Sequence, residues 1–226
     1  MDGRHLGVAG SIAVLLLLAA CGPDGDEPST TTGAQRALPA PATDGGLGLN
    51  DALANRRSVR GFTGETLTAE EISQLLWAAQ GITADWGGRT APSAGALYPI
   101  EVYVADRDGV LHYVPDGHRT QRVTDADLRA ALAEAAGGQE AVGAAPSVFV
   151  IAAVPGRTEA KYGDRADRYV ALEAGHVCQN LLLEATALGL GAVPVGAFSD
   201  EAVRSALGLP GDVTPLYLVP VGHPQA

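Results

Sequence analysis

An unbroken apolar run, Ser147 to Ala153, constrains the fold of this chain more than any other segment. The run has the length of a typical strand, and Val, Phe and Ile, which favour strands, dominate it. A strand that is exposed on one face would alternate apolar and polar residues, whereas this run has no polar residue after its first position. The run therefore predicts a buried strand, which other elements of the domain must cover.

Other segments predict helices and strands in an order that decides the fold class. Thr68 and Glu71 have the form of a capping box, and apolar residues at helical spacing follow until Gly81. Residues 100–114 contain two short alternating runs around a turn, which predicts a hairpin. Further expected elements are a helix from Thr124 to about Ala136, the longest helix from Arg168 to Leu188 closed by Gly189, a strand or extended loop at 192–198, a short helix from Ser199 to Gly208, and a final strand at 216–221. Because strict βαβ alternation is missing, this mixture predicts an α+β domain.

The N-terminus resembles the signal of a bacterial lipoprotein. Leu6 to Ala20 is an apolar run too short to span a bilayer comfortably, and small residues precede Cys21. Such a signal implies export, lipidation of Cys21, and anchoring to the bacterial cell envelope without a spanning helix. The alternatives are an uncleaved membrane anchor or a misassigned start of the chain, because Asp2 partly offsets Arg4 in the charged leader.

Composition divides the chain into three parts. Residues 1–20 are the expected signal peptide. Residues 21–46 are rich in Pro, Thr and Gly, with Leu38 as the one large hydrophobic residue, and are expected to form a flexible tether. Residues 47–226 suit a single domain with a sizeable core.

Cysteine count and charge exclude several kinds of site and partner. With Cys21 lipidated, Cys178 is the only cysteine of the domain, so no internal disulfide is possible, and its apolar helical surroundings suit a small core residue. No Cys/His cluster has the spacing of metal ligands, and we therefore expect no metal. A net charge of −11 argues against nucleic acid as a partner.

A dense basic cluster at residues 56–60, with the sequence RRSVR, is unusual in this acidic chain. Guanidinium groups donate paired, coplanar hydrogen bonds to phosphate oxygens, and a serine adds a short donor. The cluster also follows a short apolar-periodic segment around Leu49, Ala52 and Leu53, and arginines near a helix C-terminus complement the helix dipole. From these residues alone, an anion-binding site and a solvated helix end are both open.

A second motif lies about 35 residues further on, where residues 91–99 have the sequence APSAGALYP. This segment resembles the flavin-contacting loop and helix start of the nitroreductase fold, and the basic cluster resembles the first FMN-binding element of that fold. The variant SAGALYP resembles one branch, the thiazole/oxazole-forming dehydrogenases of the SagB/ThcOx type. The combination carries the resemblance, which covers roughly residues 49–224. It implies a nitroreductase-like central mixed sheet flanked by helices, with the long helix at a homodimer interface.

The resemblance also implies an FMN site at that interface, built from two subunits. Arg56 and Ser58 would hold the phosphate with help from Arg57, and Arg60 would reach the N1/O2 edge of the ring, where positive charge stabilises the reduced flavin. Many nitroreductases complete the phosphate site with basic residues near the C-terminus, which this chain lacks. Either His223 substitutes for them or the first cluster holds the phosphate.

Two further segments are implied to contact the ring. Pro92, Ser93 and Gly95 would lie along it, where a small residue lets the backbone approach closely. The apolar segment 193–197 resembles the one whose backbone amide hydrogen-bonds flavin N5. The expected contacts there are Pro194, Val195 and Gly196. A Pro-x-Gly sequence is also common in plain turns, so this segment depends on the other motifs for its interpretation.

Lys161 and Tyr162 are the expected catalytic pair. Residues 161–180 resemble the dehydrogenase branch, in which the Lys-Tyr pair serves in proton abstraction while the flavin takes a hydride. A positive charge beside a phenol favours its proton-accepting form. An exposed Lys-Tyr pair in a loop, without a catalytic role, is the alternative. Glu173 and His176 can share a helical face, and we interpret His176 as a buried structural residue, with a proton relay as the alternative.

Together these features predict an exported, lipid-anchored FMN oxidoreductase. As a dehydrogenase of the thiazole/oxazole-forming type, it would take a hydride from a small-molecule or modified-peptide substrate to flavin N5. Two alternatives stay open: an NAD(P)H-dependent nitro- or quinone reductase, and a flavin-binding lipoprotein without turnover. We expect a homodimer, contact with the membrane through the lipid anchor only, and no nucleic-acid partner.

Overall fold

The computed structural model describes residues 33–225, so the predicted signal peptide, Cys21 and the first part of the predicted tether lie outside the described residues. In chain order the elements are β1 (Gln35–Ala37), α1 (Leu49–Asn55), α2 (Ala69–Gln80), the 3₁₀ turn η1 (Ala94–Ala96), β2 (Ile100–Asp106), β3 (Gly109–Val114), β4 (Arg119–Thr124), α3 (Arg129–Ala135), α4 (Glu140–Ala144), β5 (Ser147–Ala153), α5 (Gly156–Tyr162), the 3₁₀ turn η2 (Gly163–Arg165), α6 (Ala166–Ala187), β6 (Gly191–Ala192), α7 (Asp200–Leu207) and β7 (Thr214–Gly222). No helix within this part of the chain is both long and apolar enough to cross a membrane.

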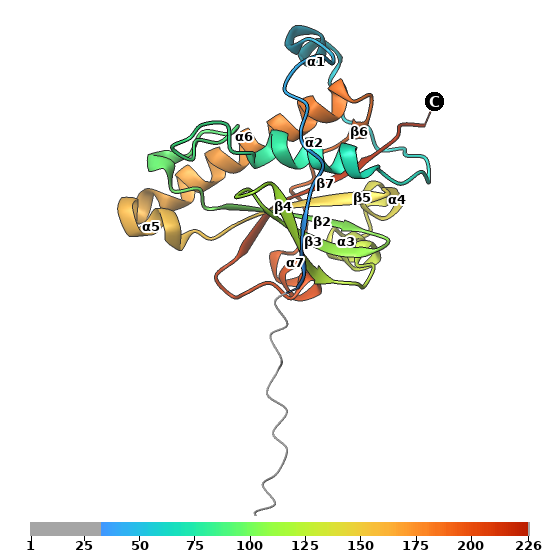
Figure 1. Ribbon diagram of the computed structural model, residues 1–226. Coiled ribbons are helices and arrows are strands. Elements are labelled where there is room, and N and C mark those ends of the chain that lie inside the picture. Colours follow the sequence, from blue (N-terminus) through green and yellow to red (C-terminus); the bar gives the residue numbers. More distant parts are fainter. Residues whose placement is uncertain (1–32, 226) are drawn as a thin grey trace, which may run out of the picture. The chain divides into compact units, whose positions relative to one another are not determined.

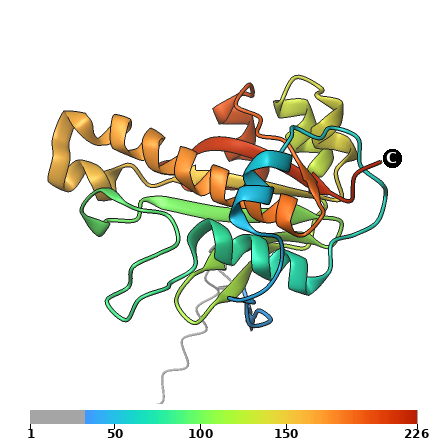
Figure 2. The same cartoon turned by 90° about the horizontal axis from the view of Figure 1, so that it is seen from above.

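A seven-stranded sheet forms the centre of the domain, with the strand order β1-β4-β3-β2-β5-β7-β6 (Figures 1 and 2). All pairings between these strands are antiparallel. A parallel pairing is added by the isolated bridge between Ser58 and Ala192. β5 has the bounds predicted for the apolar run, lies between β2 and β7, and is buried at every position, which confirms the buried strand and the α+β class.

Helices cover both faces of the sheet, which explains why β5 has almost no polar position. Successive side chains of a strand point to opposite faces. Phe149 and Ile151 therefore lie in one core with residues of α2 and α6, whereas Val148 and Val150 lie in a second core with residues of α3, α4 and α7. Figure 1 shows α2 and α6 above the sheet and α3 and α7 below it.

The helix ends that carry local signals are confirmed. The Thr68 hydroxyl accepts a hydrogen bond from the Glu71 N–H at 3.1 Å, and Glu71 Oε2 accepts one from the Thr68 N–H at 2.7 Å, so the capping box is complete. Ser199 caps α7 by accepting from the Ala202 N–H, and Gly208 ends that helix in the left-handed conformation. Capping depends on residues within one turn, which is why the sequence predicts it well.

One local prediction was wrong, and the structure defines two other segments more closely. Thr124 does not begin a helix, because it ends β4, and the following helix starts only at Arg129. β4 carries polar residues on both faces, and its pairing with β3 and β1, rather than its own pattern, makes it a strand. Residues 156–162 form α5, which places Lys161 and Tyr162 in the last turn of a helix rather than in a loop. At 192–198, where a strand or an extended loop was expected, strand β6 ends at Ala192 and the following residues form a loop with an isolated bridge from Val195 to Leu218.

Residues 33–46 pack on the domain, although we expected a tether up to residue 46. β1 pairs with β4 at the edge of the sheet, and Leu38 packs against the first core. Ala42 exchanges two hydrogen bonds with the Gln74 side chain, at 2.9 and 3.1 Å. Backbone pairing with a free sheet edge needs few hydrophobic residues, so composition alone does not reveal it.

His118 fastens this N-terminal segment to the domain. Its Nε2 lies 2.7 Å from Ser73 Oγ, and its Nδ1 lies 2.9 Å from the Tyr113 hydroxyl. Ser73 donates its only proton to the Pro39 carbonyl at 2.6 Å, so the imidazole must donate to Ser73 Oγ from Nε2. Burial lowers the pKa of His118 and so favours the neutral ring, in which Nδ1 accepts from the Tyr113 hydroxyl.

We expect His118 to make folding pH-dependent. A lowered pKa in the folded state means that the unfolded chain binds the proton more readily, so stability is full above the ordinary value of 6.5 and falls as the pH drops below it. His118→Asn, which tolerates the positive φ of 44° at this position, should be less stable at neutral pH and lack this loss. Urea unfolding at about pH 8 and about pH 5 measures the difference between the two proteins. A difference that does not shrink at low pH would contradict the assignment.

Candidate active site

The basic cluster lies beside the segment that follows α6. Ser58 forms a parallel bridge with Ala192, and the Val59 N–H donates to the Ala192 carbonyl at 3.0 Å. The backbones approach closely, since a Cβ at Gly191 would come within 2.6 Å of Val59 Cγ1. The basic cluster at 56–60 and the segment that leads into 193–197 are therefore neighbours in one chain.

The two interpretations of the basic cluster apply to different arginines. Arg57 Nη1 donates to the carbonyls of Ala54 and Arg56, at 2.9 and 2.8 Å, and so satisfies the C-terminal end of α1. Arg56 and Arg60 form no side-chain hydrogen bond or ion pair within residues 33–225, and Ser58 is exposed. Arg57 thus behaves as a helix-end charge, while the donors of the other three residues are available to an anion.

A cavity of about 230 Å³ opens beside this cluster. It is lined by Arg60, Gln139, Glu140, Ala141, Val193, Pro194 and Val195. No sequence motif points to Gln139 and Glu140, which precede and begin the five-residue helix α4. Gln139 Nε2 donates to the carbonyls of Ala136 and Ala197, at 3.1 and 2.9 Å, and ties the end of α3 to the segment after α6.

The backbone amide of Gly196 is free to act as a donor. Val195 exchanges both of its backbone hydrogen bonds with Leu218, at 2.8 and 3.0 Å, which fixes the preceding residue on the sheet. Pro194 has no N–H, and the Gly196 N–H has no acceptor among residues 33–225. A Cβ at Gly196 would meet nothing within 4 Å, so the surrounding space is open. An exposed donor on a fixed backbone can bind a ring nitrogen of a ligand.

A second cluster brings together Gly95, Lys161 and Tyr162. A Cβ at Gly95 would lie 2.8 Å from Tyr162 Oη and 2.9 Å from Lys161 Nζ, so only glycine leaves room for both polar groups. Lys161 Nζ lies 5.5 Å from the centre of the Tyr162 ring, and that ring contacts Tyr169 edge-on at 5.0 Å. The loop at 91–99 and the segment that begins at Lys161 are thus also neighbours. The predicted catalytic pair faces the loop that is expected to contact the ring.

The loop that carries Gly95 is strained. Besides Gly95, at a φ of 64°, the non-glycine residues Ala96 and Tyr98 have left-handed φ values of 54° and 46°. Each such residue costs about 1–2 kcal/mol. Ser93 Oγ accepts from the Tyr98 N–H at 2.9 Å, and the Arg89 guanidinium stacks on the Tyr98 ring at 4.3 Å. These contacts hold the backbone in a shape that it would not adopt by itself.

Glu173 of α6 is buried beneath this loop. Burial raises the pKa of Glu173, although Ser93, Arg89 and Gln80 beside it act in the opposite direction. Its Oε1 and Gln80 Nε2 have no hydrogen-bond partner in the described chain. His176 is exposed, so our interpretation of it as a buried structural residue was wrong. The two side chains do not face the same way on α6.

The two clusters lie at opposite ends of α6 (Figure 1). Lys161 and Tyr162 precede its N-terminus with only η2 between, and β6 with segment 193–197 follows its C-terminus. A helix of 22 residues is about 33 Å long. One small ligand cannot contact both ends of the same helix, so a ligand that uses both clusters needs a second copy of the chain.

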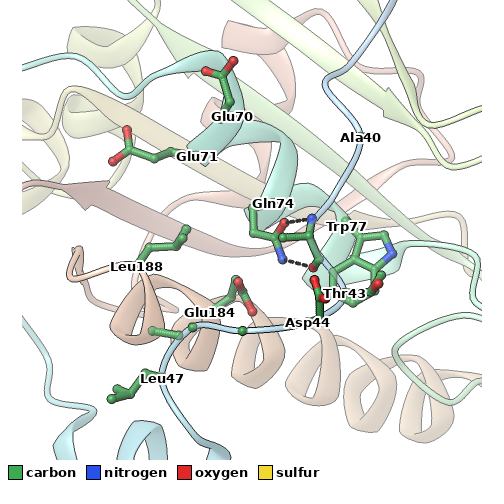
Figure 3. Close-up of a pocket in the computed structure, with 14 residues that line it drawn as sticks. Ala40, Thr43, Asp44, Leu47, Glu70, Glu71, Gln74, Trp77, Glu184 and Leu188 are labelled. Carbon is green, nitrogen blue, oxygen red and sulfur yellow. Dashed lines mark hydrogen bonds between the residues drawn. The ribbon is translucent and has the colours of Figure 1, made fainter.

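A larger cavity, of about 460 Å³, lies elsewhere (Figure 3). Segment 40–47, α2 and the C-terminal end of α6 enclose it, and no predicted site residue lines it. Asp44, Glu70, Glu71 and Glu184 contribute carboxylates, and Trp77 contributes an aromatic wall. No three His, Cys, Asp or Glu side chains within residues 33–225 gather as metal ligands, here or at either cluster.

The C-terminal segment returns to the basic cluster, but His223 does not join it. The Thr63 N–H donates to the His223 carbonyl at 2.8 Å, and the Gln225 N–H donates to the Gly61 carbonyl at 3.1 Å. The His223 ring faces Glu71, with 3.7 Å between Nε2 and Oε1. The sequence left open whether His223 or the arginines of the basic cluster supply positive charge for a phosphate. Arg56 and Arg60 have free donors, whereas the His223 ring faces Glu71.

Comparison with known proteins identifies the family. The model of the nitroreductase family matches residues 53–223, which is most of the chain. This protein belongs to the nitroreductase family. The predicted fold and the predicted enzyme class, an oxidoreductase of this family, are therefore confirmed.

Several relatives and solved structures are similar to this nitroreductase-family chain. A protein of Methanocaldococcus jannaschii that carries the name nitroreductase is 47% identical, with 77% of this chain and 90% of the relative covered. The FMN reductase [NAD(P)H] of Bacillus subtilis is 26% identical, with 76% and 64% covered. A crystal structure from Ralstonia eutropha, also named as a nitroreductase, has a TM-score of 0.78 at 32% identity and covers 85% of this chain and 90% of its own. A chain of the microcin synthetase McbBCD complex of Escherichia coli, with truncated pro-MccB17 bound, has a TM-score of 0.66 at 25% identity, with 84% and 79% covered.

We expect Gly95→Ala to disturb the second cluster. The positive φ alone should lower the free energy of unfolding by about 1–2 kcal/mol, and the new methyl group should displace Lys161 Nζ and Tyr162 Oη. Gly211→Ala is the matched control, because a Cβ there meets nothing within 4 Å and φ is not positive. Thermal unfolding of both variants measures the difference. Equal midpoints would show that Gly95 is not needed for its conformation.

Proposed function

We propose that this protein is an FMN-dependent oxidoreductase whose two active sites form between two copies of the chain. The first cluster of one copy would hold the phosphate and one edge of the ring, and the second cluster of the other copy would face the reacting side. The separation of the two clusters by the length of α6 supports this arrangement. The names of the relatives, FMN reductase among them, support the cofactor.

The residues present fit an FMN molecule. Arg56 and Ser58 offer free donors for a phosphate, with Arg57 adding charge beside them, and Arg60 opens onto the adjoining cavity. The other residues assigned to the cofactor are Pro92, Ser93 and Gly95 of the loop and Pro194, Val195 and Gly196 of the segment after α6. Gly95 leaves space where a side chain would project, and the unpaired Gly196 amide is a donor for a ring nitrogen.

The observation that carries the finer assignment is the packing of Lys161 and Tyr162 over Gly95. Two proton-transferring groups at the expected flavin-facing loop suit a reaction that removes a proton from the substrate. Bound FMN would supply the hydride acceptor, so the substrate would lose two electrons and two hydrogens. Oxidation of a thiazoline or oxazoline to the aromatic ring is such a reaction. The structural similarity to a chain of microcin synthetase, which was solved with a peptide precursor, supports a dehydrogenase of this type.

An NAD(P)H-dependent nitro- or quinone reductase is the second candidate. The names of the relatives favour it, since the M. jannaschii protein is called a nitroreductase and the B. subtilis protein an FMN reductase. A reductase would not need the Lys161 and Tyr162 pair for proton removal. The third candidate, a flavin-binding protein without turnover, would need neither an oxidant nor a reductant.

The exposed apolar residues support a homodimer through α6 and α1. Leu172 on α6 is 56% exposed, and Leu49 and Leu53 on α1 are 67% and 52% exposed. Burial of such residues against a second copy stabilises an interface. Anchoring of this dimer to the cell envelope through Cys21, and its export, remain part of the proposal that the N-terminal sequence supports.

The dehydrogenase assignment predicts that Lys161→Ala slows flavin reduction by about 10²–10⁴-fold. Tyr162→Phe, which keeps the ring and removes the hydroxyl, should have an effect of the same order. Anaerobic stopped-flow mixing of the FMN-loaded protein with a thiazoline-containing model peptide, followed by flavin absorbance, measures this rate. The same mixing with NADH and NADPH is the counter-test. Rapid bleaching by NAD(P)H in the wild type and in both variants would favour the reductase instead.

The phosphate assignment predicts a selective loss of FMN affinity. Arg56→Ala should raise the FMN dissociation constant by about tenfold or more, because a charge-assisted hydrogen bond to phosphate is lost and the His223 ring faces Glu71 rather than the cluster. Arg36→Ala, at an exposed position on β1, is the control and should bind FMN like the wild type. Quenching of FMN fluorescence during titration measures both constants. Unchanged affinity in Arg56→Ala would remove this residue from the site.

A further inference from the structure

The helix that carries the Lys-Tyr pair is weakly anchored by apolar contacts. Of the seven residues of α5, all of them in the described part of the chain, only Thr158 is buried. Its N-terminal residue receives no side-chain cap, and its C-terminal end leads directly into η2. Apolar packing therefore does little to fix the direction in which Lys161 and Tyr162 point.

One guanidinium connects this helix to the loop and to the sheet. Arg157 Nη1 donates to the Tyr98 carbonyl at 3.0 Å, and Arg157 Nη2 lies 2.5 Å from Glu101 Oε1. The Tyr98 carbonyl closes the strained loop 93–98, and Glu101 is the second residue of β2. Because the guanidinium is planar and presents its donors in a rigid fork, these two bonds fix the relative positions of three elements.

Glu101 is itself held in place. Its second oxygen, Oε2, lies 2.5 Å from His112 Nε2 on β3, and the His112 ring stacks on Tyr103 at 4.7 Å. Burial acts to raise the pKa of Glu101, but His112 and Arg157 outweigh it, so the net pKa is lowered and the carboxylate stays charged. Arg157 thus binds a fixed, charged acceptor rather than a mobile surface group.

The loop and α5 consequently touch at two points. Gly95 contacts Lys161 and Tyr162 in the last turn of α5, and Tyr98 is bonded to Arg157 in the first turn. Arg157 and Lys161 are four residues apart and lie on one face of the helix. Two contacts on one face define both the distance and the angle between the loop and the helix.

We propose that Arg157 is a positioning residue for the active site: its bonds to the Tyr98 carbonyl and to Glu101 hold loop 93–98 in register with Lys161 and Tyr162. The proposal goes beyond the cofactor and reaction type, and its catalytic consequence rests on the proposed function. Its structural part, the fastening of the loop, is independent of any ligand.

The experiment compares three variants of the full chain without FMN. Arg157→Gln removes the positive charge. Arg157→Lys keeps a positive charge beside Glu101 but loses the guanidinium fork, which also donates to the Tyr98 carbonyl. Arg119→Gln is the matched control, since Arg119 pairs with Asp116 at the other side of the sheet and its side chain is 37% exposed against 44% for Arg157. Hydrogen–deuterium exchange, followed by mass spectrometry, reports on peptides that cover 93–98 and 156–162.

We expect exchange in loop 93–98 to rise by about tenfold in Arg157→Gln, because a hydrogen bond to a charged group is lost. Arg157→Lys should unfold at nearly the wild-type temperature but still show faster exchange in the loop. The control should leave both peptides unchanged. Wild-type exchange in the loop of Arg157→Lys would overturn the proposal, even if Arg157→Gln failed to fold.

The catalytic part has its own measurement. After loading with FMN, Arg157→Lys should lower the single-turnover rate with the thiazoline peptide by about tenfold. Its FMN dissociation constant should rise by less than the rate falls, because loop 93–98 supplies only part of the proposed cofactor contacts and the phosphate cluster lies at the other end of α6. A loss of affinity as large as the loss of rate would overturn the positioning role. If no variant, the wild type included, reduces FMN with this peptide, the proposed function fails, whereas faster exchange in the loop would still establish the fastening.

Discussion

The burial of β5 on both faces is the constraint on which the rest of the structure depends. A strand with no polar residue after its first position needs apolar cover above and below the sheet, and two layers of helices supply it. On one side α6 provides the longest part of that cover, and its residues Val177 and Leu181 are fully buried. The helix must therefore run the length of the sheet, and the segments at its two ends are held far apart. Both segments carry predicted site residues, so the demands of the core decide where the chemistry can take place.

This separation has a consequence for what one chain can do. The first cluster has free cationic donors that suit a phosphate but does not contain the Lys161 and Tyr162 pair, and the second has that pair but no phosphate-binding group that the sequence or the structure identifies. Under the proposed function, each cluster is half of a site. Leu172 of α6 and Leu49 and Leu53 of α1 are exposed, and the proposed dimer would bury such apolar side chains against a second copy. Under the proposed function, the chain can catalyse its reaction only when it associates with a second copy.

The sequence predicts what depends on neighbouring residues and misses what depends on distant ones. The capping box at Thr68, the bounds of β5 and the end of α7 at Gly208 follow from contacts within a turn or a strand. The paired motifs also locate both clusters, because their residue types are unusual. By contrast, β1 and β4 become strands through pairing with each other and with β3. Gln139 and Arg157 matter because their long side chains reach carbonyls 58 and 59 residues away in the chain, which no local pattern records.

The support of loop 93–98 explains polar groups that the fold alone does not need. Glu173 is 3% exposed and Gln80 is 1% exposed, and each has one side-chain atom without a partner in the described chain. Such atoms lower stability, and apolar residues of similar size would fill the same space without that loss. Both residues lie beside Arg89 and below Ser93, next to two non-glycine residues in the left-handed conformation. Strain and incompletely satisfied polar groups therefore coincide at the loop that faces Lys161 and Tyr162. A core selected for stability alone would contain neither the strained residues nor the unpaired polar atoms. The proposed active site above them is the best explanation for their position.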